Sequence, residues 1–550
     1  MDKPQKRRHR STAEPEPAPA AASPDPARAA PAGGTARRYG YTSPQGSPSA
    51  PGGGDAVATV LVAPEPPPTV PAGEPDDPTP GPRRRRRLAV GLAVLLVASA
   101  AGVGGWWYTR PSGPSFPAAW DPRVADLVSF VEDERGLDFE HPVHVDFVAD
   151  AEFRELVTSD EADLTAEDRE EIEEGVGLLR ALGLVEGDID LFEAVNKLSG
   201  EGILAFYDPE TKRIRVRGTE LTVKVRGTLV HELTHALQDQ VFDLTREGEF
   251  EIEAQNDTYR PVFEGDASRV ETAWVEELGE ADLAAYSEEV SAEVEGTDLS
   301  DIPEALQVFF FSDYDFGEPF VQALLADGGR KAVDRALEEP PTSDAQLLDP
   351  FRYLAGDRPE DVDEPALAAG EKRSDGGDFG AFGLYVVLAQ RIDPHQALRA
   401  ADAWEGDAYV TYRADGRQCV QAAFVAADAA GVAALGDALG AWVSAMPDGV
   451  ASLDRRADSV RLTSCDPGTD VGDAAPGTLS TALALPLTRT YMALGALGGG
   501  LTRDLAYCVG DRFIAGFSAA ELQSMLSGTE ATDALVSGAE RAAVACRDAG

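Results

Sequence analysis

The hydrophobic and polar positions divide the chain into stretches of different character. Residues 1–82 are rich in Pro, Ala, Gly and Ser and show no sustained apolar period, which predicts a disordered tail. Residues 88–108 contain 21 residues without a charge. Residues 111–119 resemble a short stalk, and from Trp120 onward the spacing of apolar positions becomes that of a globular protein.

Residues 120–381 alternate between helical and strand-like spacing. The segments 141–148, Ile203–Tyr207 and Arg213–Arg217 predict strands, and a turn at Asp208 and Pro209 joins the last two into a hairpin. Apolar positions at helical spacing predict helices over residues 124–137, 166–184, 188–198, 219–240, 260–285, 318–326 and 330–337.

Residues 382–550 predict a mixed α+β unit. Alternating apolar runs predict strands at Tyr409–Tyr412, Cys419–Ala426, Val460–Leu462 and Leu505–Val509, and an Ala-rich stretch predicts a helix at 429–446. No repeat of fixed period occurs, which disfavours a solenoid or a propeller.

The uncharged segment 88–108 predicts a single-pass transmembrane helix, because 21 helical residues cross a hydrocarbon core of about 30 Å. Arg83–Arg87 precede it directly, so the basic flank and helix together occupy residues 83–110. The preference for basic residues on the inner side predicts a cytoplasmic N-terminus, a cell-membrane location, and an extracytoplasmic chain beyond Arg110. The alternative is a late signal peptide with a cleavage site at Ala98–Ala100, and it gives the same location for the C-terminal part.

The net charge of −48 is unevenly distributed. Residues 1–110 carry 14 Lys and Arg against 9 Asp and Glu, a net +5, which leaves −53 on the remaining 440 residues. Phosphate groups bind clustered Lys and Arg, so this acidic part is not expected to bind nucleic acid.

All four cysteines lie in the last quarter of the chain: Cys419, Cys465, Cys508 and Cys546. They predict two disulfides, of which the pairs Cys419–Cys465 and Cys508–Cys546 are the simplest of three possible arrangements. No CxxC pair supports the alternative of a cysteine metal site.

The strongest chemical signal is HELTH, at residues 231–235. Spacing i, i+4 on a helix places His231 and His235 on one face, where both imidazoles bind one Zn²⁺, and Glu232 lies beside them as a general base for water. With six histidines in 550 residues, chance gives such a match about 0.007 times.

A catalytic zinc site needs a third protein ligand and an open position for water. Glu264 follows 29 residues after His235, within reach of a second helix packed on the first, and is the first choice. Glu271, about two turns further on, is the second choice, and His395 is remote in sequence.

HELTHALQDQ followed by EGDA resembles the gluzincin clan, the thermolysin-like zinc metallopeptidases. AFYDPETKRIRV before it, and a PPTS loop and Trp404–Asp407 after it, resemble uncharacterised bacterial membrane-linked members of that clan, over about residues 200–410. The resemblance implies a mainly helical, zincin-like domain at 120–381 with a small antiparallel sheet, followed by the α+β unit at 382–550. It also implies that a strand of the hairpin is an edge to which an extended peptide adds.

Carried over residue by residue, the resemblance implies His231, His235 and Glu264 as zinc ligands and Glu232 as general base. One position departs from the family. Where those enzymes have an acidic residue that orients a ligand histidine, four positions after the glutamate, this chain has Ser268. Asp266 or Asp239 is the candidate for that role, and Tyr314 is a candidate donor to the transition state.

Other conspicuous residues have structural explanations. His141 and His144 fall on a predicted strand, Trp404 and Asp407 fit a turn, and His395 is expected at the surface. The leading hypothesis is a zinc peptidase acting on a peptide or protein substrate. The alternatives are a zinc-dependent cell-wall peptide hydrolase and a non-catalytic binding or scaffold protein that keeps zinc for stability.

Overall fold

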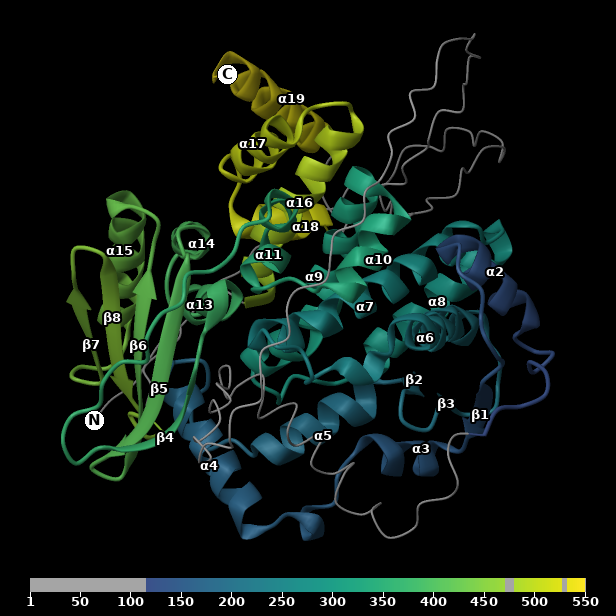
Figure 1. Cartoon of the computed structure of the whole chain (residues 1–550), viewed down its shortest axis with the longest axis horizontal. Coiled ribbons are helices and arrows are strands. Elements are labelled where there is room, and N and C mark those ends of the chain that lie inside the picture. The colour runs from purple at the N-terminus through teal and green to yellow at the C-terminus, as the bar shows by residue number, and fades with distance from the viewer. Residues whose placement is uncertain (1–114, 470–478, 527–531, 550) are drawn as a thin grey trace, which may run out of the picture. The chain divides into compact units, whose positions relative to one another are not determined.

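The computed structural model describes residues 115–469, 479–526 and 532–549. Helices predominate among them and two small sheets are present, which confirms the predicted α+β class with a helical majority (Figure 1). The predicted tail at 1–82 lies outside the described residues.

The first sheet has the strand order β1-β3-β2, from β1 (His144–Val148), β3 (Arg213–Arg217) and β2 (Ala205–Asp208). Strands β2 and β3 form the predicted antiparallel hairpin, and its turn is fixed by Asp208 Oδ1, which accepts the N–H groups of Glu210 and Thr211. Strand β1 is parallel to β3, so the sheet is mixed and not wholly antiparallel. Strand β2 is left at an edge.

Helix α6 (Val223–Phe242) follows the hairpin and packs against α7 (Glu253–Glu276), which packs in turn against α9 (Glu304–Gly328). The helix expected over 260–285 is two helices, α7 and α8 (Glu280–Gly296), because the first ends before Gly279. The other helices of this region are α2 (Ala125–Arg135), α3 (Asp150–Val157), α4 (Ala166–Ala181), α5 (Leu191–Gly202), α10 (Arg330–Glu338), α11 (Ala345–Leu348) and α12 (Pro350–Ala355).

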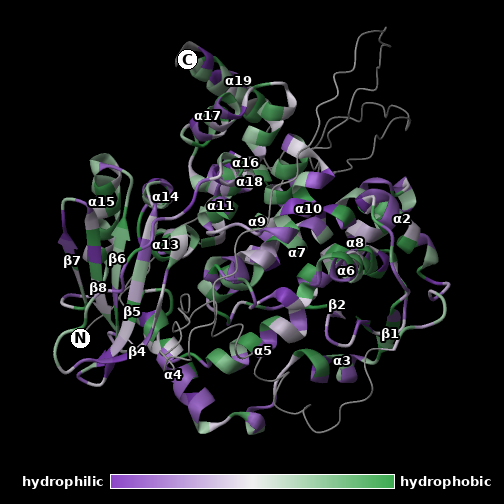
Figure 2. Cartoon of the chain, viewed as in Figure 1, coloured by the Kyte–Doolittle hydropathy of each residue, from purple (hydrophilic) through white to green (hydrophobic). Residues whose placement is uncertain are grey.

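The second sheet is antiparallel throughout, in the order β4-β5-β6-β8-β7. Its strands are β4 (Lys372–Gly377), β5 (Gly406–Ala414), β6 (Arg417–Val425), β7 (Ala451–Arg455) and β8 (Ser459–Cys465), with α13 (Gly380–Ala389), α14 (Pro394–Asp402) and α15 (Ala429–Ala445) between them. Strands β5 and β6 are buried on both faces over most of their length, and apolar residues make up most of their sequences. Figure 2 shows that β6 and α15 are mostly hydrophobic, whereas the first half of α4 is hydrophilic.

The C-terminal part is helical, with α16 (Leu479–Gly498), α17 (Arg503–Ile514), α18 (Ala519–Leu526) and α19 (Thr532–Ala549). The strand predicted at Leu505–Val509 is wrong, since these residues belong to α17. The buried residues Ala506, Val509, Gly510 and Phe513 recur at the spacing of one helix face. A five-residue apolar run is too short to tell that spacing from a strand.

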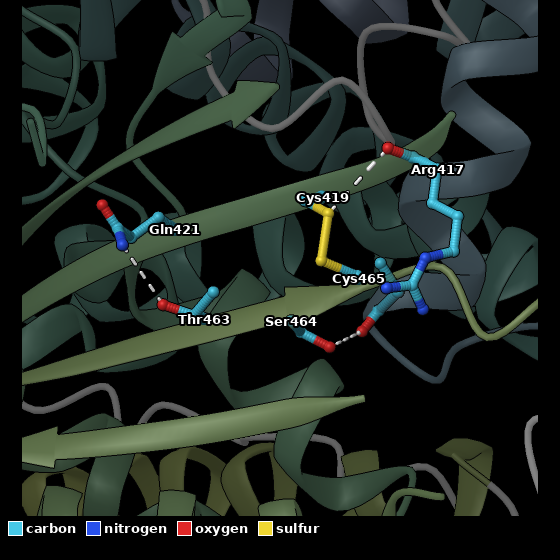
Figure 3. Close-up of a disulfide and its surroundings, with 7 residues drawn as sticks. Arg417, Cys419, Gln421, Thr463, Ser464 and Cys465 are labelled. Carbon is cyan, nitrogen blue, oxygen red and sulfur yellow. Dashed lines mark hydrogen bonds between the residues drawn. A yellow bond between two sulfur atoms is a disulfide. The ribbon is translucent and has the colours of Figure 1, made fainter. Parts of the chain in front are cut away.

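Two disulfides join the pairs Cys419–Cys465 and Cys508–Cys546, which confirms the simplest pairing. The first links directly paired residues of β6 and β8, beside a hydrogen bond from Gln421 Nε2 to Thr463 Oγ1 (Figure 3). The second ties α17 to α19.

Buried apolar side chains form two clusters. The smaller contains α2, the first sheet and the apolar face of α6, and the larger runs from Val176 to Cys546. The division of the chain at residue 382 stays a prediction.

The prediction of a membrane-spanning helix, with the membrane partner and cell-membrane location that follow from it, is corrected. No helix within residues 115–469, 479–526 and 532–549 is long and apolar enough to cross a membrane. The longest, α7 and α9, carry acidic side chains along their length. The segment 88–108, for which the span was predicted, lies outside the described residues.

Candidate metal centre

Helix α6 separates its residues into a core face and a polar face. Leu229, Leu233 and Leu237 are fully buried against the first sheet, as their spacing predicts. The helix begins at Thr222, whose hydroxyl accepts the N–H of Val225, and ends at Asp243, which has a positive φ of 59°.

His231, His235 and Glu264 meet on the polar face of α6, where α7 packs on it. The two Nε2 atoms are 3.0 Å apart, and Glu264 Oε2 lies 3.1 Å from His231 Nε2 and 3.2 Å from His235 Nε2. Ligand atoms about 2.0–2.1 Å from a tetrahedral zinc ion are about 3.3 Å apart. The three predicted ligand residues are therefore together, at a spacing that could hold a metal ion.

The triad is buried, with its residues 5 to 8% exposed. In the parts of the chain that the structure describes, no other three His, Cys, Asp or Glu side chains offer ligand atoms this close together. Burial opposes ionisation of Glu264, but His235 and His231 outweigh it and hold the pKa of Glu264 well below its usual range. Burial also disfavours charged His231, yet Glu264 and Glu271 raise its pKa above 6.5. Both shifts favour the charged forms of His231 and Glu264 in the metal-free protein.

His235 is oriented by a chain of buried polar groups. Its Nδ1 lies 3.0 Å from Gln238 Oε1, and Gln238 Nε2 donates to Asp266 Oδ2 at 2.8 Å. Asp266 in turn pairs with Arg135 at 2.8 Å, both fully buried. Gln238 as acceptor places the proton of His235 on Nδ1, which leaves Nε2 able to bind a metal. Asp266, a predicted candidate for orienting a ligand histidine, therefore acts on His235 through Gln238. The role of Gln238 was not predicted from the sequence.

His231 is oriented by Glu271 instead. Glu271 Oε2 lies 3.6 Å from His231 Nδ1, and Tyr286 on α8 donates to Glu271 Oε1 at 3.2 Å. Glu271 therefore faces the ring nitrogen of His231 opposite the one that meets Glu264, and is placed to orient that histidine. The available signal was its position seven residues after Glu264, two turns along one helix face.

Glu232 is anchored by the edge strand. Its Oε2 accepts the backbone N–H of Tyr207 at 2.6 Å, and the Tyr207 hydroxyl donates to Asp239 Oδ2 at 2.6 Å. Lys212 donates to the same Asp239 oxygen. The second candidate, Asp239, thus supports Glu232 through Tyr207 rather than a histidine. Burial is the main cause of the raised pKa of Glu232.

Tyr314 lies on α9 across from His231, with its ring centroid 6.1 Å from that of the imidazole. It is 44% exposed. Partial desolvation, followed by the charges of Glu264 and Glu232, raises the pKa of Tyr314, so its hydroxyl keeps its proton at neutral pH. It lines the same cavity as His231, Glu232 and Glu264.

These side chains border a cavity of about 610 Å³. His231, Glu232 and Glu264 form one wall, and His235 lies behind them. Ile203, Leu204 and Ala205 bring the start of β2 to the cavity.

The other conspicuous residues lie outside the cavity lining. His141 stacks on Phe116, His144 lies on β1, and His395 Nε2 donates to the carbonyl oxygen of Phe517 at 2.9 Å. Asp407 accepts the N–H of Trp404 Nε1, as expected of residues that stabilise a turn.

The chain matches no protein-family model, no curated protein and no solved structure. Function must therefore be argued from the site itself.

Proposed function

We propose that this chain is a zinc-dependent metallopeptidase, in which His231, His235 and Glu264 hold the metal and Glu232 is the general base. One observation carries the proposal: a buried His-His-Glu triad adjoins one cavity, which His231, Glu264 and a second glutamate, Glu232, help to line. Three protein ligands beside accessible space are typical of catalytic zinc, whereas structural zinc sites have four. The resemblance of HELTH and EGDA to gluzincins agrees with this proposal.

Zinc, when bound there, supplies Lewis acidity, which polarises a carbonyl group and makes water nucleophilic near neutral pH. The protein's own part begins with Glu232, which takes the proton of the attacking water and passes it to the leaving amine. Its raised pKa makes it a stronger base than an exposed glutamate. The Tyr207 N–H holds one carboxylate oxygen in place, so the other is directed at the reacting water.

Strand β2 offers the backbone groups that an extended peptide needs. In the β2–β3 ladder Leu204 accepts the N–H of Arg217, so the alternate residues Ala205 and Tyr207 direct their backbone groups away from β3. Tyr207 N–H is used by Glu232, which leaves Ala205 at the cavity to pair with substrate. Tyr314 would then donate to the oxygen that becomes negative in the transition state.

The test compares wild-type protein with Glu232→Gln, each loaded with zinc. The substrates are an unfolded protein and, separately, peptidoglycan, and the control is Glu276→Gln at the exposed end of α7. Glu232→Gln should keep its zinc and lose turnover by at least about 100-fold, the contribution of a general base. Glu276→Gln should behave as wild type.

Turnover that survives in Glu232→Gln would contradict the role of Glu232. A zinc-loaded wild type that cleaves neither substrate would contradict the enzymatic function and favour a binding or scaffold protein. Cleavage of peptidoglycan alone would restrict the function to cell-wall peptides.

A further inference from the structure

Three consecutive phenylalanines on α9 pack against the core and stay partly exposed. Phe309, Phe310 and Phe311 are each partly exposed, while Leu306 and Val308 beside them are buried. All three line the cavity that contains the triad. Consecutive helix positions point about 100° apart, so the three rings face different directions around this turn. Because all three line the cavity, the cavity curves around the helix surface here.

A second element completes this wall. Phe382, at the start of α13, lies edge-on to Phe309 and Phe316 with ring centroids 6.0 and 5.1 Å apart. Phe316 and Phe382 also line the cavity. We call Phe309, Phe310, Phe311, Phe316 and Phe382 the aromatic wall.

Two carboxylates fix the start of α13 and so the position of Phe382. Asp407 accepts the N–H groups of Phe379 and Gly380 at 2.6 and 3.0 Å, and Asp344 accepts those of Ala381 and Phe382 at 2.9 and 3.2 Å. These are the four N–H groups that lack partners at a helix N-terminus. Asp344, directly after the PPTS loop, and Asp407, in the Trp404–Asp407 segment, thus both hold the helix start that carries Phe382.

The cavity is also negatively charged. Its two basic side chains are already paired. Lys224 pairs with Glu293, and Arg260 makes two hydrogen bonds to Glu247, at 3.0 and 3.2 Å. Eight carboxyl groups lie in the lining: Glu232, Glu247, Asp257, Glu264, Glu271, Glu293, Asp313 and Asp344. Glu247 and Glu293 are the partners of the two basic groups, and burial raises the pKa of Asp313 to about 7, so Asp313 is only partly charged at neutral pH. A bound zinc ion would offset only two of these charges. Acidic ligands should therefore be repelled, and a terminal carboxylate finds no basic partner that is not already engaged.

We propose that the aromatic wall is the subsite for a large apolar side chain of a peptide, close to the hydrolysed bond, and that an acidic side chain is excluded from it. This rests on the proposed function, since the wall and the triad share one cavity. Apolar rings on a pre-formed wall bind an apolar side chain without reorganisation, and the surrounding carboxylates add the selection against acids. The substrate class is a peptide whose residue at the aromatic wall is aromatic or long and aliphatic.

The test uses quenched fluorescent peptides that are identical except for Phe, Ala or Glu at one scanned position. Zinc-loaded wild-type protein should prefer Phe to Ala by at least about 10-fold in kcat/KM at one position, with Glu the poorest. Phe310→Ala combined with Phe311→Ala should bring the Phe-to-Ala ratio close to one. The control is Phe351→Ala, a partly buried phenylalanine on α12 outside the cavity, which should leave the ratio unchanged.

A binding measurement separates this subsite from the enzymatic function. The same peptides are titrated into zinc-loaded Glu232→Gln protein, and binding is followed by fluorescence anisotropy. Tighter binding of the Phe peptide supports the subsite even if wild-type protein cleaves nothing, which would be a failure of the proposed function alone. Equal binding of the Phe, Ala and Glu peptides, or a preference for Phe that survives removal of Phe310 and Phe311, would overturn the subsite.

Discussion

Gly265 and Gly317 touch through their backbones, at the point where α7 crosses α9. A Cβ atom on Gly265 would lie 2.1 Å from the carbonyl carbon and oxygen of Gly317, and one on Gly317 would lie 2.2 Å from the carbonyl oxygen of Pro261. Gly265 follows the ligand Glu264 directly, and Gly317 lies three residues from Tyr314. This contact therefore fixes the distance between the triad and the helix that carries Tyr314 and the aromatic wall.

Gly265→Ala and Gly317→Ala should each destabilise the protein, because the obstructing atoms are backbone and cannot turn aside. Overpacking of this kind costs about 1–3 kcal/mol. The measurement is the free energy of unfolding in denaturant. The control is Gly495→Ala on α16, where a Cβ atom meets nothing within 4 Å and the change should be neutral or slightly stabilising. Equal effects at all three glycines would contradict the backbone contact.

Glu271→Ala should weaken zinc binding without removing a ligand. Its carboxylate faces His231 Nδ1 at 3.6 Å, and loss of such a group lowers metal affinity by about 10–100-fold. The affinity is measured by competition with a chromophoric chelator, and Glu276→Ala is the matched glutamate on the same helix. A loss as complete as that in a ligand variant would instead make Glu271 a ligand.

Zinc affinity should rise with pH, and the zinc-free protein should lose stability at high pH. The pKa of His231 is raised above its ordinary 6.5, so its stabilising charge is complete below 6.5 and is lost as the pH rises through the raised value. The pKa of Glu264 is lowered from 4.5, so its contribution is present above 4.5 and is lost only as the pH falls through that lowered value.

The pair therefore stabilises the zinc-free protein most between pH 4.5 and 6.5, and the competition of protons with zinc for His231 weakens as the pH rises from there. The check is thermal unfolding with and without zinc, from pH 5 to 9. The rise in unfolding temperature that zinc causes should grow with pH. If the rise stays constant over this pH range, zinc displaces no proton from His231, and the prediction is wrong.

Removal of the Cys508–Cys546 disulfide should lower stability and leave the metal site intact. The bridge closes a loop of 38 residues, which in the chain-entropy description contributes about 4 kcal/mol. The double substitution Cys508→Ala with Cys546→Ala should shift the unfolding midpoint while the zinc content stays unchanged. Loss of zinc along with stability would mean that the C-terminal helices support the triad.

The site was predictable from the sequence where its geometry is local. His231, Glu232 and His235 lie within one helical turn, so their spacing alone places them together, and Glu264 follows on the next long helix. Glu271 was predicted as the second choice of ligand, and the structure places it on the other ring nitrogen of His231. Its distance from His231 depends on how α7 packs on α6, which spacing does not determine.

The aromatic wall was beyond sequence reasoning for a different reason. Phe309 and Phe382 are 73 residues apart, and they meet only because Asp344 and Asp407 hold the start of α13. Such contacts depend on tertiary packing. The strand predicted at Leu505–Val509 is wrong because a short apolar run fits the period of a helix as well as that of a strand. The membrane helix was inferred from hydropathy alone, and no described helix is long and apolar enough to span a membrane.

The zinc content of the purified full chain tests the central claim most directly. Metal analysis after removal of loosely bound ions should give one zinc per wild-type chain, and His231→Ala, His235→Ala and Glu264→Ala should each lose most of it while remaining folded. A folded wild-type protein that takes up no stoichiometric zinc, or variants that hold as much as wild type, would contradict the account.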